Sequence, residues 1–311
     1  MKARILLTGK NGQVGGELCR LLPSLGELIA PDRADLDLEK PGDIRRAVRS
    51  YRPNLIVNAA AYTAVDLAEQ DAVIAHTVNA EAPAILAEEA GNLGSLLVHY
   101  STDYVFDGRK ASPYEETDVP NPLSVYGKSK FAGEQAVHSS GVPHFIFRTS
   151  WIYGRRGRNF LTTILRLATQ NEELKVVVDQ IGAPSWSREI AAATVRVLEQ
   201  VTVKESFDPA TLPGINAVYH MSARGAASWF EFAELILQQS RAISPRTPWF
   251  LAATDGRPLI ARRVIPIPSE DYPSPALRPA NSLLSNSRLE RTFRVEMTDW
   301  RAQLQAVFHD A

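Results

Sequence analysis

The stretch Thr8-Gly9-Lys10-Asn11-Gly12-Gln13-Val14-Gly15 decides the fold of this chain. It follows the apolar run Ala3-Arg4-Ile5-Leu6-Leu7, which is typical of a buried strand, and it leads into a helical pattern from Gln13 to Leu22. Its three glycines allow a tight turn and a close approach to a pyrophosphate, while the helix N-terminus offers unpaired N–H groups. The order strand, turn, helix predicts nucleotide binding, and the plainer alternative is a tight turn without a ligand.

The first half of the chain continues this alternation of short strands and longer helices. Further strand candidates are Leu55-Ile56-Val57, Leu96-Leu97-Val98 and Phe145-Ile146-Phe147. Further helix candidates are Gly42 to Tyr51, Asn79 to Asn92 and Tyr126 to Val137. Nearly continuous apolar strands fit a parallel sheet that helices cover on both faces. The sequence therefore predicts an α/β fold with a doubly wound parallel sheet (Rossmann).

The second half predicts a smaller α/β domain for the substrate. Residues 1–150 are expected to form the dinucleotide-binding domain, with segments around 175–222 returning to it, and 151–174 with 223–311 to form mainly the substrate domain. Lys175 to Glu199 and Ala217 to Met221 are the candidate returning segments. Prolines between Ile265 and Pro279 predict an irregular lid or pocket wall, and Asp299 to Phe308 an amphipathic helix.

Composition limits the classes of partner. The chain has 311 residues with 34 basic and 35 acidic side chains, so its formal charge of -1 gives no reason to expect nucleic acid or an anionic membrane. The single cysteine, Cys19, excludes an internal disulfide framework. We find no charged and apolar leader and no run of 18 apolar residues, so a cytoplasmic location is expected.

Charged residues after the expected second strand bear on the choice of cofactor. An acid such as Asp32 would contact a ribose 2′-hydroxyl, whereas a guanidinium such as Arg33 would favour a 2′-phosphate. Lys10 is a second candidate phosphate partner, so NADPH is favoured, with NADH as an alternative. Asp37 and Leu38 are candidates to bracket the adenine, or else form part of a solvated acidic loop.

Tyr126 and Lys130 lie four residues apart and so share one face of a helix. A nearby ammonium stabilises a phenolate, and lowering a tyrosine pKa from about 10 to about 7 takes roughly 4 kcal/mol. This spacing alone also fits an ordinary exposed pair. Thr102, at the end of an apolar run, would supply a hydroxyl that both donates and accepts hydrogen bonds, although threonine is also simply common in strands.

Together these residues resemble the extended short-chain dehydrogenase/reductase family, and within it the dTDP-4-dehydrorhamnose reductases. The motifs that carry the resemblance extend from end to end: Gly12-Gln13-Val14-Gly15, Asn58-Ala59-Ala60-Ala61-Tyr62-Thr63-Ala64-Val65-Asp66, Ser101-Thr102-Asp103-Tyr104-Val105-Phe106, Tyr126-Gly127-Lys128-Ser129-Lys130, Arg148-Thr149-Ser150-Trp151, Asp179-Gln180, Gly182-Ala183-Pro184 and Arg278-Pro279-Ala280-Asn281-Ser282.

The resemblance implies NADPH-dependent reduction of the C4 ketone of a dTDP-linked 4-keto-6-deoxy sugar, the last step toward dTDP-L-rhamnose. Tyr126 would donate the proton, Lys130 would hold the nicotinamide ribose and stabilise the phenolate, and Thr102 would orient the carbonyl. Glycine-turn residues expected at the cofactor are Gly9, Lys10, Asn11, Gly12, Gln13 and Val14.

The resemblance also implies secondary contacts. Ala61, Tyr62, Thr63 and Tyr100 correspond to positions beside the cofactor, and Asp103 and Trp151 to contacts with the sugar nucleotide, together with Thr102 and Tyr126. Trp151 would equally suit a core position. Arg278 is a candidate diphosphate ligand by its charge type, or an ordinary surface arginine.

One departure concerns metal binding. Some proteins that this chain resembles bind magnesium at a dimer interface through carboxylates, and at one such position this chain carries Arg188. No metal is therefore predicted, and both a monomer and a homodimer stay open.

Two other functions fit parts of the pattern. A nucleotide-sugar epimerase or dehydratase shares the tyrosine and lysine but returns the hydride, and the dehydratases have an acid pair where this chain has only Asp103 beside Thr102. A non-catalytic, NADP-binding regulatory subunit would keep the fold, but it has no need of Tyr126 and Lys130.

Overall fold

The computed structural model describes residues 2–203, 206–207 and 216–309. Six parallel strands of this part of the chain form one twisted sheet in the order β12-β5-β4-β3-β1-β2. Their bounds are β1 (Arg4–Thr8), β2 (Glu27–Ile29), β3 (Leu55–Asn58), β4 (Leu96–Thr102), β5 (His144–Thr149) and β12 (Ala217–His220). The chain reverses its direction of travel across the sheet between β1 and β3, which is where doubly wound folds bind ligands.

Side chains alternate between the two faces of this sheet, and both faces are buried. On one face, Leu6, Ile56 and Leu97 pack in one hydrophobic cluster. On the other, Leu7, Val57 and their neighbours pack in a second cluster. Successive side chains of a strand point to opposite faces of the sheet, so a continuous apolar strand contributes to the hydrophobic cluster on each face.

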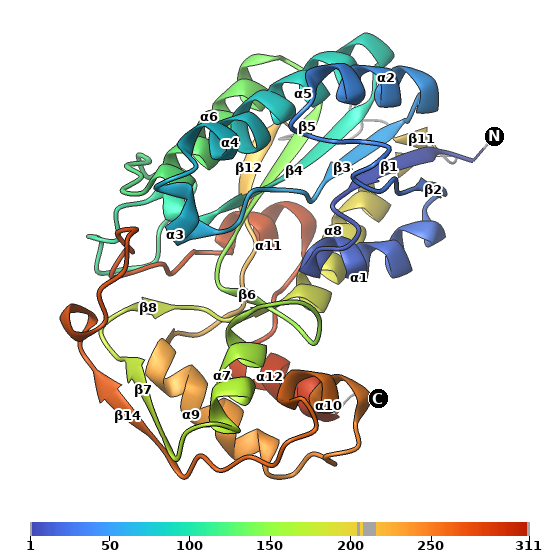
Figure 1. Ribbon diagram of the computed structural model, residues 1–311. Helices are drawn as coiled ribbons and strands as arrows, with labels where there is room; N and C mark the ends of the chain where they lie inside the picture. Colours follow the sequence, from blue (N-terminus) through green and yellow to red (C-terminus); the bar gives the residue numbers. More distant parts are fainter. Residues whose placement is uncertain (1, 204–205, 208–215, 310–311) are drawn as a thin grey trace.

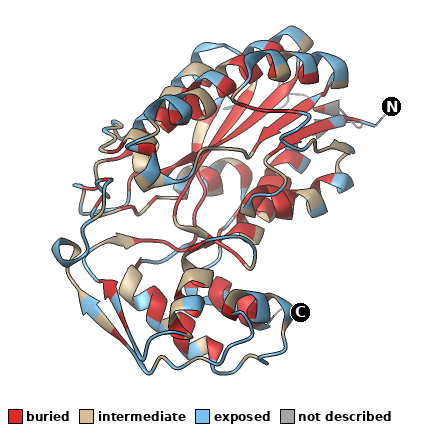
Figure 2. Ribbon diagram, in the orientation of Figure 1, coloured by how far each residue is buried: buried red, intermediate tan, exposed pale blue. Residues whose placement is uncertain are grey.

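Helices cover both faces (Figures 1 and 2). One layer comprises α2 (Pro41–Tyr51), α4 (Ala72–His76), α5 (Ala82–Leu93) and α6 (Val125–Ser139), with the four-residue α3 (Val65–Ala68) beside α6. The opposite layer comprises α1 (Gln13–Leu21), α8 (Ser187–Val201) and α11 (Ser287–Phe293). Figure 2 shows their buried sides turned toward the strands.

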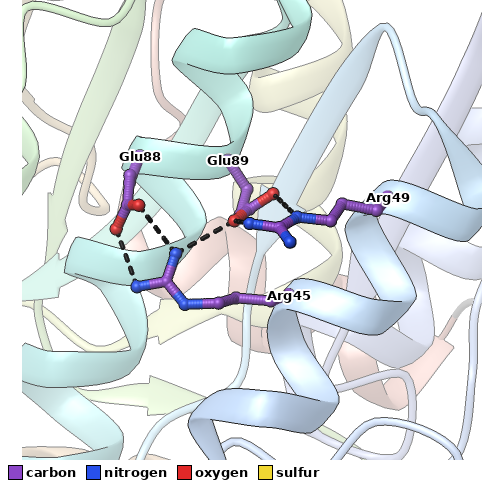
Figure 3. Close-up of polar contacts among 4 residues, drawn as sticks. All are labelled: Arg45, Arg49, Glu88 and Glu89. Carbon is purple, nitrogen blue, oxygen red and sulfur yellow. Dashed lines mark hydrogen bonds and ion pairs between the residues drawn. The ribbon is translucent and has the colours of Figure 1, made fainter.

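Ion pairs clamp α2 to α5 (Figure 3). Arg49 forms two hydrogen bonds to Glu89, at 2.8 and 2.7 Å, and Arg45 bridges Glu88 and Glu89. The Glu89 side chain is 1% exposed, and the hydrogen bond from Arg49 lowers its pKa against the effect of burial. The clamp therefore fixes two helices of one layer to each other on the flank of the sheet.

The remaining elements form a smaller lobe beside the carboxyl ends of the strands (Figure 1). Its helices are α7 (Phe160–Ala168), α9 (Trp229–Ser240), α10 (Pro248–Thr254) and α12 (Trp300–His309). Its short strands pair as β14 (Arg263–Ile267) with β7 (Glu173–Val177), β13 (Ala227–Ser228) with β8 (Ile181–Gly182), and β6 (Ile152–Tyr153) with β9 (Ser185–Trp186). Outside the lobe, β10 (Thr202–Val203) pairs with β11 (Ser206–Phe207), and Phe207 packs in the same cluster as Leu7 of the large sheet. The lobe has its own hydrophobic cluster around Trp186, Phe232 and Trp300.

The predicted fold class is confirmed, with corrections in the second half. Ala217–His220 joins the large sheet beside β5, as expected for a returning segment. In the segment Lys175 to Glu199, α8 packs on α1, but the strand β7 pairs with β14 in the smaller lobe. The pairing also places Pro266 in a regular strand, although the prolines of this segment predict irregular structure. An edge strand tolerates proline where its N–H group is not needed for a hydrogen bond.

Some questions of organisation stay as predicted. Residues 204–205 and 208–215 of the expected returning segment lie outside the described residues, and the two-domain division stays a prediction. Within the described ranges, none of the helices combines the length and the apolar character needed to cross a membrane.

Candidate active site

A cleft lies at the carboxyl ends of β1, β3 and β4, between the sheet and the smaller lobe. It consists of two hollows of about 260 and 640 Å³ that share Gly9, Asn11, Gly12, Ala60 and Ala61 in their walls. The smaller one also has Lys10, Asp32, Arg33, Asp37, Leu38 and Tyr62 in its wall, and we call it the adenosine end. The larger one has Gln13, Val14, Thr63, Tyr100, Thr102, Asp103, Tyr126, Lys130 and Trp151, and we call it the catalytic end.

The glycine turn has the close contacts that its sequence predicts. Gly9 adopts φ +76°, and a Cβ there would lie 2.6 Å from the backbone nitrogen of Ala60. A Cβ on Gly15 would lie 2.0 Å from the Gly9 carbonyl oxygen. The α1 N-terminus begins at Gly12 without a side-chain cap, so its first N–H groups are directed to the cleft without competition from a capping side chain.

One further side chain fits a bound pyrophosphate at this helix end. The buried Gln13 Oε1 atom has no hydrogen-bond partner within the described structure, but as an acceptor it does not bind a phosphate oxygen. Arg156, from the loop after β6, lies over the same turn, with its Nη1 atom 3.3 Å from where a Cβ on Gly16 would stand. The residues present therefore fit an anionic dinucleotide.

At the adenosine end, charges of both signs are paired with each other. Lys10 Nζ lies 3.0 Å from Asp32 Oδ2, and a hydrogen bond from this lysine lowers the pKa of Asp32. Arg33 lies 3.4 Å from Asp37 and also pairs with Glu39. Asp32, which favours NADH, therefore lies in the same wall as Lys10 and Arg33, which favour NADPH.

Local structure brings the catalytic candidates together. Thr102 ends β4, while Tyr126 and Lys130 project from the first turns of α6. Ser124 caps that helix by accepting a hydrogen bond from the Gly127 N–H at 3.1 Å. Gly127 allows the helix to approach the loop after β4, because a Cβ there would stand 2.3 Å from the Tyr104 carbonyl oxygen.

The expected lowering of the Tyr126 pKa is wrong for the protein alone. Burial raises the pKa of Tyr126 to about 12 against the opposing effect of a hydrogen bond with Thr102, and the charge of Asp103 contributes to the rise. The spacing of Tyr126 and Lys130 predicts a shared face but says nothing of burial, which here has the larger effect. Tyr126 is therefore a fully protonated phenol near neutral pH, as a proton donor must be.

Lys130 is 2% exposed and held from β4. Its ammonium donates to the Tyr100 carbonyl oxygen at 2.6 Å and lies 3.4 Å from His99 Nε2. Burial lowers its pKa to about 8, against the attraction of Glu134. The Tyr100 phenol forms a 2.6 Å hydrogen bond with Thr194. Tyr100 therefore contacts Lys130 through its backbone carbonyl and not through its side chain.

Asp103 is a buried carboxyl directly behind the catalytic groups. Its oxygens accept hydrogen bonds from Thr102 at 2.9 Å and from Ser150 at 3.2 Å. Burial raises its pKa to about 6, against the opposing effect of hydrogen bonds from Ser282, Thr102 and Ser150. Because the Thr102 hydroxyl has one hydrogen, Thr102 can donate to Asp103 or to an oxygen in the cleft, but not to both at once.

Trp151 forms the wall of the catalytic end on the side of the smaller lobe. Its indole stacks on Trp229, with centroids 3.4 Å apart and an interplanar angle of 4°. Its backbone φ of 47° is rare for a bulky residue, and a Cβ on Gly182 would lie 2.3 Å from its ring. The fold therefore holds a flat aromatic surface in a strained position at the cleft.

Arg278 does not line the cleft. Its guanidinium donates to Asp66 at 2.8 Å, and the same carboxylate accepts from the Ala276 N–H at 3.3 Å. These contacts join the proline-rich segment to α3, whose Val65 lines the catalytic end. The bond to Asp66 uses one of the five N–H groups of Arg278, so a diphosphate role for the others stays a prediction.

Several residues in the wall of the catalytic end were missed from the sequence. They are Val65, Tyr104, Ile152, Arg156, Arg158, Asn159 and Trp229. The cluster Arg155-Arg156-Gly157-Arg158 was a usable signal for an anion site, whereas Trp229 carried none because only folding brings it to Trp151. Arg188, considered for its effect on a metal site, pairs with Glu17 at 3.5 Å. Among the described residues, no cluster of three or more histidine, cysteine or acidic side chains could hold a metal ion.

Comparison with known proteins agrees with this geometry. Residues 2–311 match the family described as RmlD substrate binding domain. The dTDP-4-dehydrorhamnose reductase of Burkholderia thailandensis is 46% identical over 298 residues, which cover 96% of this chain and 95% of the relative. The enzyme of the same name from Escherichia coli K12 is 39% identical and covers 98% and 97%.

A solved structure extends the likeness to three dimensions. The dTDP-4-dehydrorhamnose reductase of Bacillus anthracis strain Ames, in complex with NADP, superposes with a TM-score of 0.86 at 32% identity, and 100% of each chain is covered.

Proposed function

Since the chain belongs to the RmlD substrate binding domain family and resembles its dTDP-4-dehydrorhamnose reductases along its whole length, we propose that it reduces dTDP-4-dehydro-L-rhamnose to dTDP-L-rhamnose with NADPH. It is an NAD(P)H-dependent oxidoreductase of the Rossmann type. The observation that carries the proposal is the convergence of Thr102, Tyr126 and Lys130 on a cleft that continues into the glycine turn.

The chemistry assigns a task to each of these side chains. When bound, NADPH supplies the hydride that the C4 carbon receives. Negative charge then builds on the carbonyl oxygen, and a positioned acid lowers that barrier. Tyr126 donates its proton to this oxygen, and the resulting phenolate is stabilised by the Lys130 ammonium. Thr102 fixes the carbonyl once its hydroxyl turns from Asp103 toward the cleft.

The remaining walls serve binding. Arg156 and the α1 N-terminus would hold the cofactor pyrophosphate, and Lys10 with Arg33 would receive a 2′-phosphate. The flat pair of Trp151 and Trp229 would pack against the sugar nucleotide. Asp103 would contact the sugar once the Thr102 hydroxyl has turned away from it.

One assay of NADPH oxidation distinguishes a reductase from the two alternatives, an epimerase or dehydratase and a regulatory subunit. Purified protein supplied with dTDP-4-dehydrorhamnose should oxidise one NADPH for each sugar reduced, followed by absorbance of the nicotinamide and by chromatography of the sugar nucleotide. Turnover without net oxidation would identify an epimerase or dehydratase. NADPH binding without turnover would identify a regulatory subunit.

Three expectations from the sequence stay predictions. They are the cytoplasmic location, the absence of a nucleic-acid partner and the state as monomer or homodimer. Preference for NADPH over NADH rests on Lys10 and Arg33, which lie in the same wall as Asp32.

A further inference from the structure

A row of buried polar side chains crosses three neighbouring strands and ends at Lys130. Thr8 of β1 is the register partner of Asn58 of β3, and Asn58 is the register partner of His99 of β4. Each of these side chains is 3% exposed or less. Thr8 Oγ1 lies 2.6 Å from Asn58 Oδ1, Asn58 Nδ2 lies 3.1 Å from His99 Nδ1, and His99 Nε2 lies 3.4 Å from Lys130 Nζ. We call Thr8, Asn58 and His99 the polar row.

The direction of each hydrogen bond in the polar row follows from its donors. The Ala60 N–H can only donate, and it does so to Thr8 Oγ1 at 3.3 Å, so the single Thr8 hydrogen is free for Asn58. A separation of 2.6 Å suits O–H···O better than N–H···O, which places the amide oxygen of Asn58 toward Thr8. The amide nitrogen therefore donates to His99 Nδ1.

This direction fixes the tautomer of His99. A neutral imidazole carries one hydrogen, and with Nδ1 accepting, that hydrogen lies on Nε2. Burial, then the charge of Lys130, then His144 all lower the pKa of His99 well below its usual value, so the ring stays neutral. An N–H donor consequently faces the amine of Lys130.

A donor in this position distinguishes the two forms of the lysine. A neutral amine has a lone pair that can accept from His99 Nε2–H, whereas an ammonium has only donors to present to it. We infer that the polar row is a positioning element that favours proton loss from Lys130 and thereby sets the upper pH limit of reduction.

Other groups around Lys130 act against or alongside the polar row. The Tyr100 carbonyl oxygen accepts from the ammonium and so favours the charged form, as does the carboxylate of Glu134 one turn along α6. Tyr126 lies one turn before Lys130 on the same helix face, and His144 of β5 lowers the pKa of His99 through its charge. Burial lowers the Lys130 pKa to about 8 against the attraction of Glu134, and the polar row acts in the same direction as burial.

The inference rests on the proposed role of Lys130, but its first test does not require the reaction. Free protein labelled with ¹⁵N-histidine is studied by NMR from pH 5 to 8, and His99 is assigned by the signal that His99→Gln removes. We expect an unprotonated Nδ1, a protonated Nε2 and no titration. A protonated Nδ1, or an imidazolium near pH 6, would overturn the inference even if the enzyme reduces its sugar as proposed.

The second test measures the high-pH limb of kcat. Asn58→Leu does not touch Lys130, but it frees His99 Nδ1 to take the hydrogen, so that Nε2 can accept from the ammonium. The limb should move upward by roughly one pH unit, the value of about one hydrogen bond.

His144→Gln removes another buried imidazole from the sheet and is the matched control. Its limb should stay at the wild-type position. An unmoved or downward limb in Asn58→Leu, or an equal shift in His144→Gln, would contradict a specific role of the polar row.

Discussion

The two ends of the cofactor cleft hold charge in opposite ways. At the adenosine end, the Lys10 and Asp32 side chains are 28% and 56% exposed, and they neutralise each other at the surface. At the catalytic end, Asp103 and Lys130 are each 2% exposed, and burial moves both pKa values toward neutrality. Solvent screens the first pair, whereas the second group of charges interacts across a medium of low polarity.

This difference suggests a division of labour. Exposed, mutually paired charges can exchange partners with a cofactor phosphate at little cost. Buried groups cannot rearrange so cheaply, but small changes in their surroundings alter their protonation strongly. Substitutions at the catalytic end should therefore affect rate and stability strongly, and substitutions at the adenosine end should affect mainly cofactor affinity.

The largest effect is expected from Tyr126→Phe. It removes the proton donor but keeps the ring that packs edge to face on Tyr104, so kcat should fall roughly 10²- to 10⁴-fold. The dissociation constant for NADPH, measured by fluorescence titration, should stay within about twofold of wild type. Retained turnover would mean that another group supplies the proton.

Glu134→Gln should give the largest loss of stability. Glu134 accepts hydrogen bonds from Arg148 at 2.9 and 2.6 Å, and both side chains are 4% exposed. Removing the carboxylate leaves the guanidinium buried without a countercharge, at a cost of about 3–5 kcal/mol in the free energy of unfolding. Urea denaturation measures this, with Asp32→Asn as the exposed control that should leave the midpoint nearly unchanged. Equal effects of the two variants would remove the distinction between buried and exposed charges.

Asp103→Asn should increase the free energy of unfolding, and the increase should depend on pH. The folded-state pKa of Asp103, about 6, lies above its ordinary value of 3.8, so ionisation penalises the fold increasingly as pH rises through that range. The variant should be stabilised relative to wild type by on the order of 1–3 kcal/mol at pH 8, and by less at pH 5. Thermal unfolding at both pH values measures this difference. A larger gain in stability at pH 5 than at pH 8 would contradict a raised pKa of Asp103 in the folded protein.

The smallest effect is expected from Lys10→Ala. Losing one partly exposed phosphate contact should raise the KM for NADPH up to roughly tenfold and leave that for NADH unchanged. Lys40→Ala is the matched control, since Lys40 pairs with Asp37 at 3.3 Å but does not line the adenosine end. If both cofactors weakened equally, Lys10 would hold a group that they share.

The sequence predicts the local features of the site better than those that depend on distant segments. The glycine turn, the strands of the first half and the shared face of Tyr126 and Lys130 are local, so spacing alone indicates them. The polar row depends on the register of three strands, and the stacking of Trp151 on Trp229 joins distant segments. The pKa of Tyr126 depends on burial, which a spacing of four residues does not report, and Arg278 pairs with an acid more than two hundred residues away.

Transfer of deuterium tests the central claim most directly. NADPH labelled with deuterium at C4 of the nicotinamide, on the transferred face, is incubated with dTDP-4-dehydrorhamnose, and the product is analysed by mass spectrometry and NMR. The account predicts one deuterium at sugar C4 for each NADPH oxidised, and labelled product formed at least about a hundredfold more slowly by Tyr126→Phe protein that still binds NADPH. A product without deuterium, or labelled product formed by Tyr126→Phe at the wild-type rate, would contradict it.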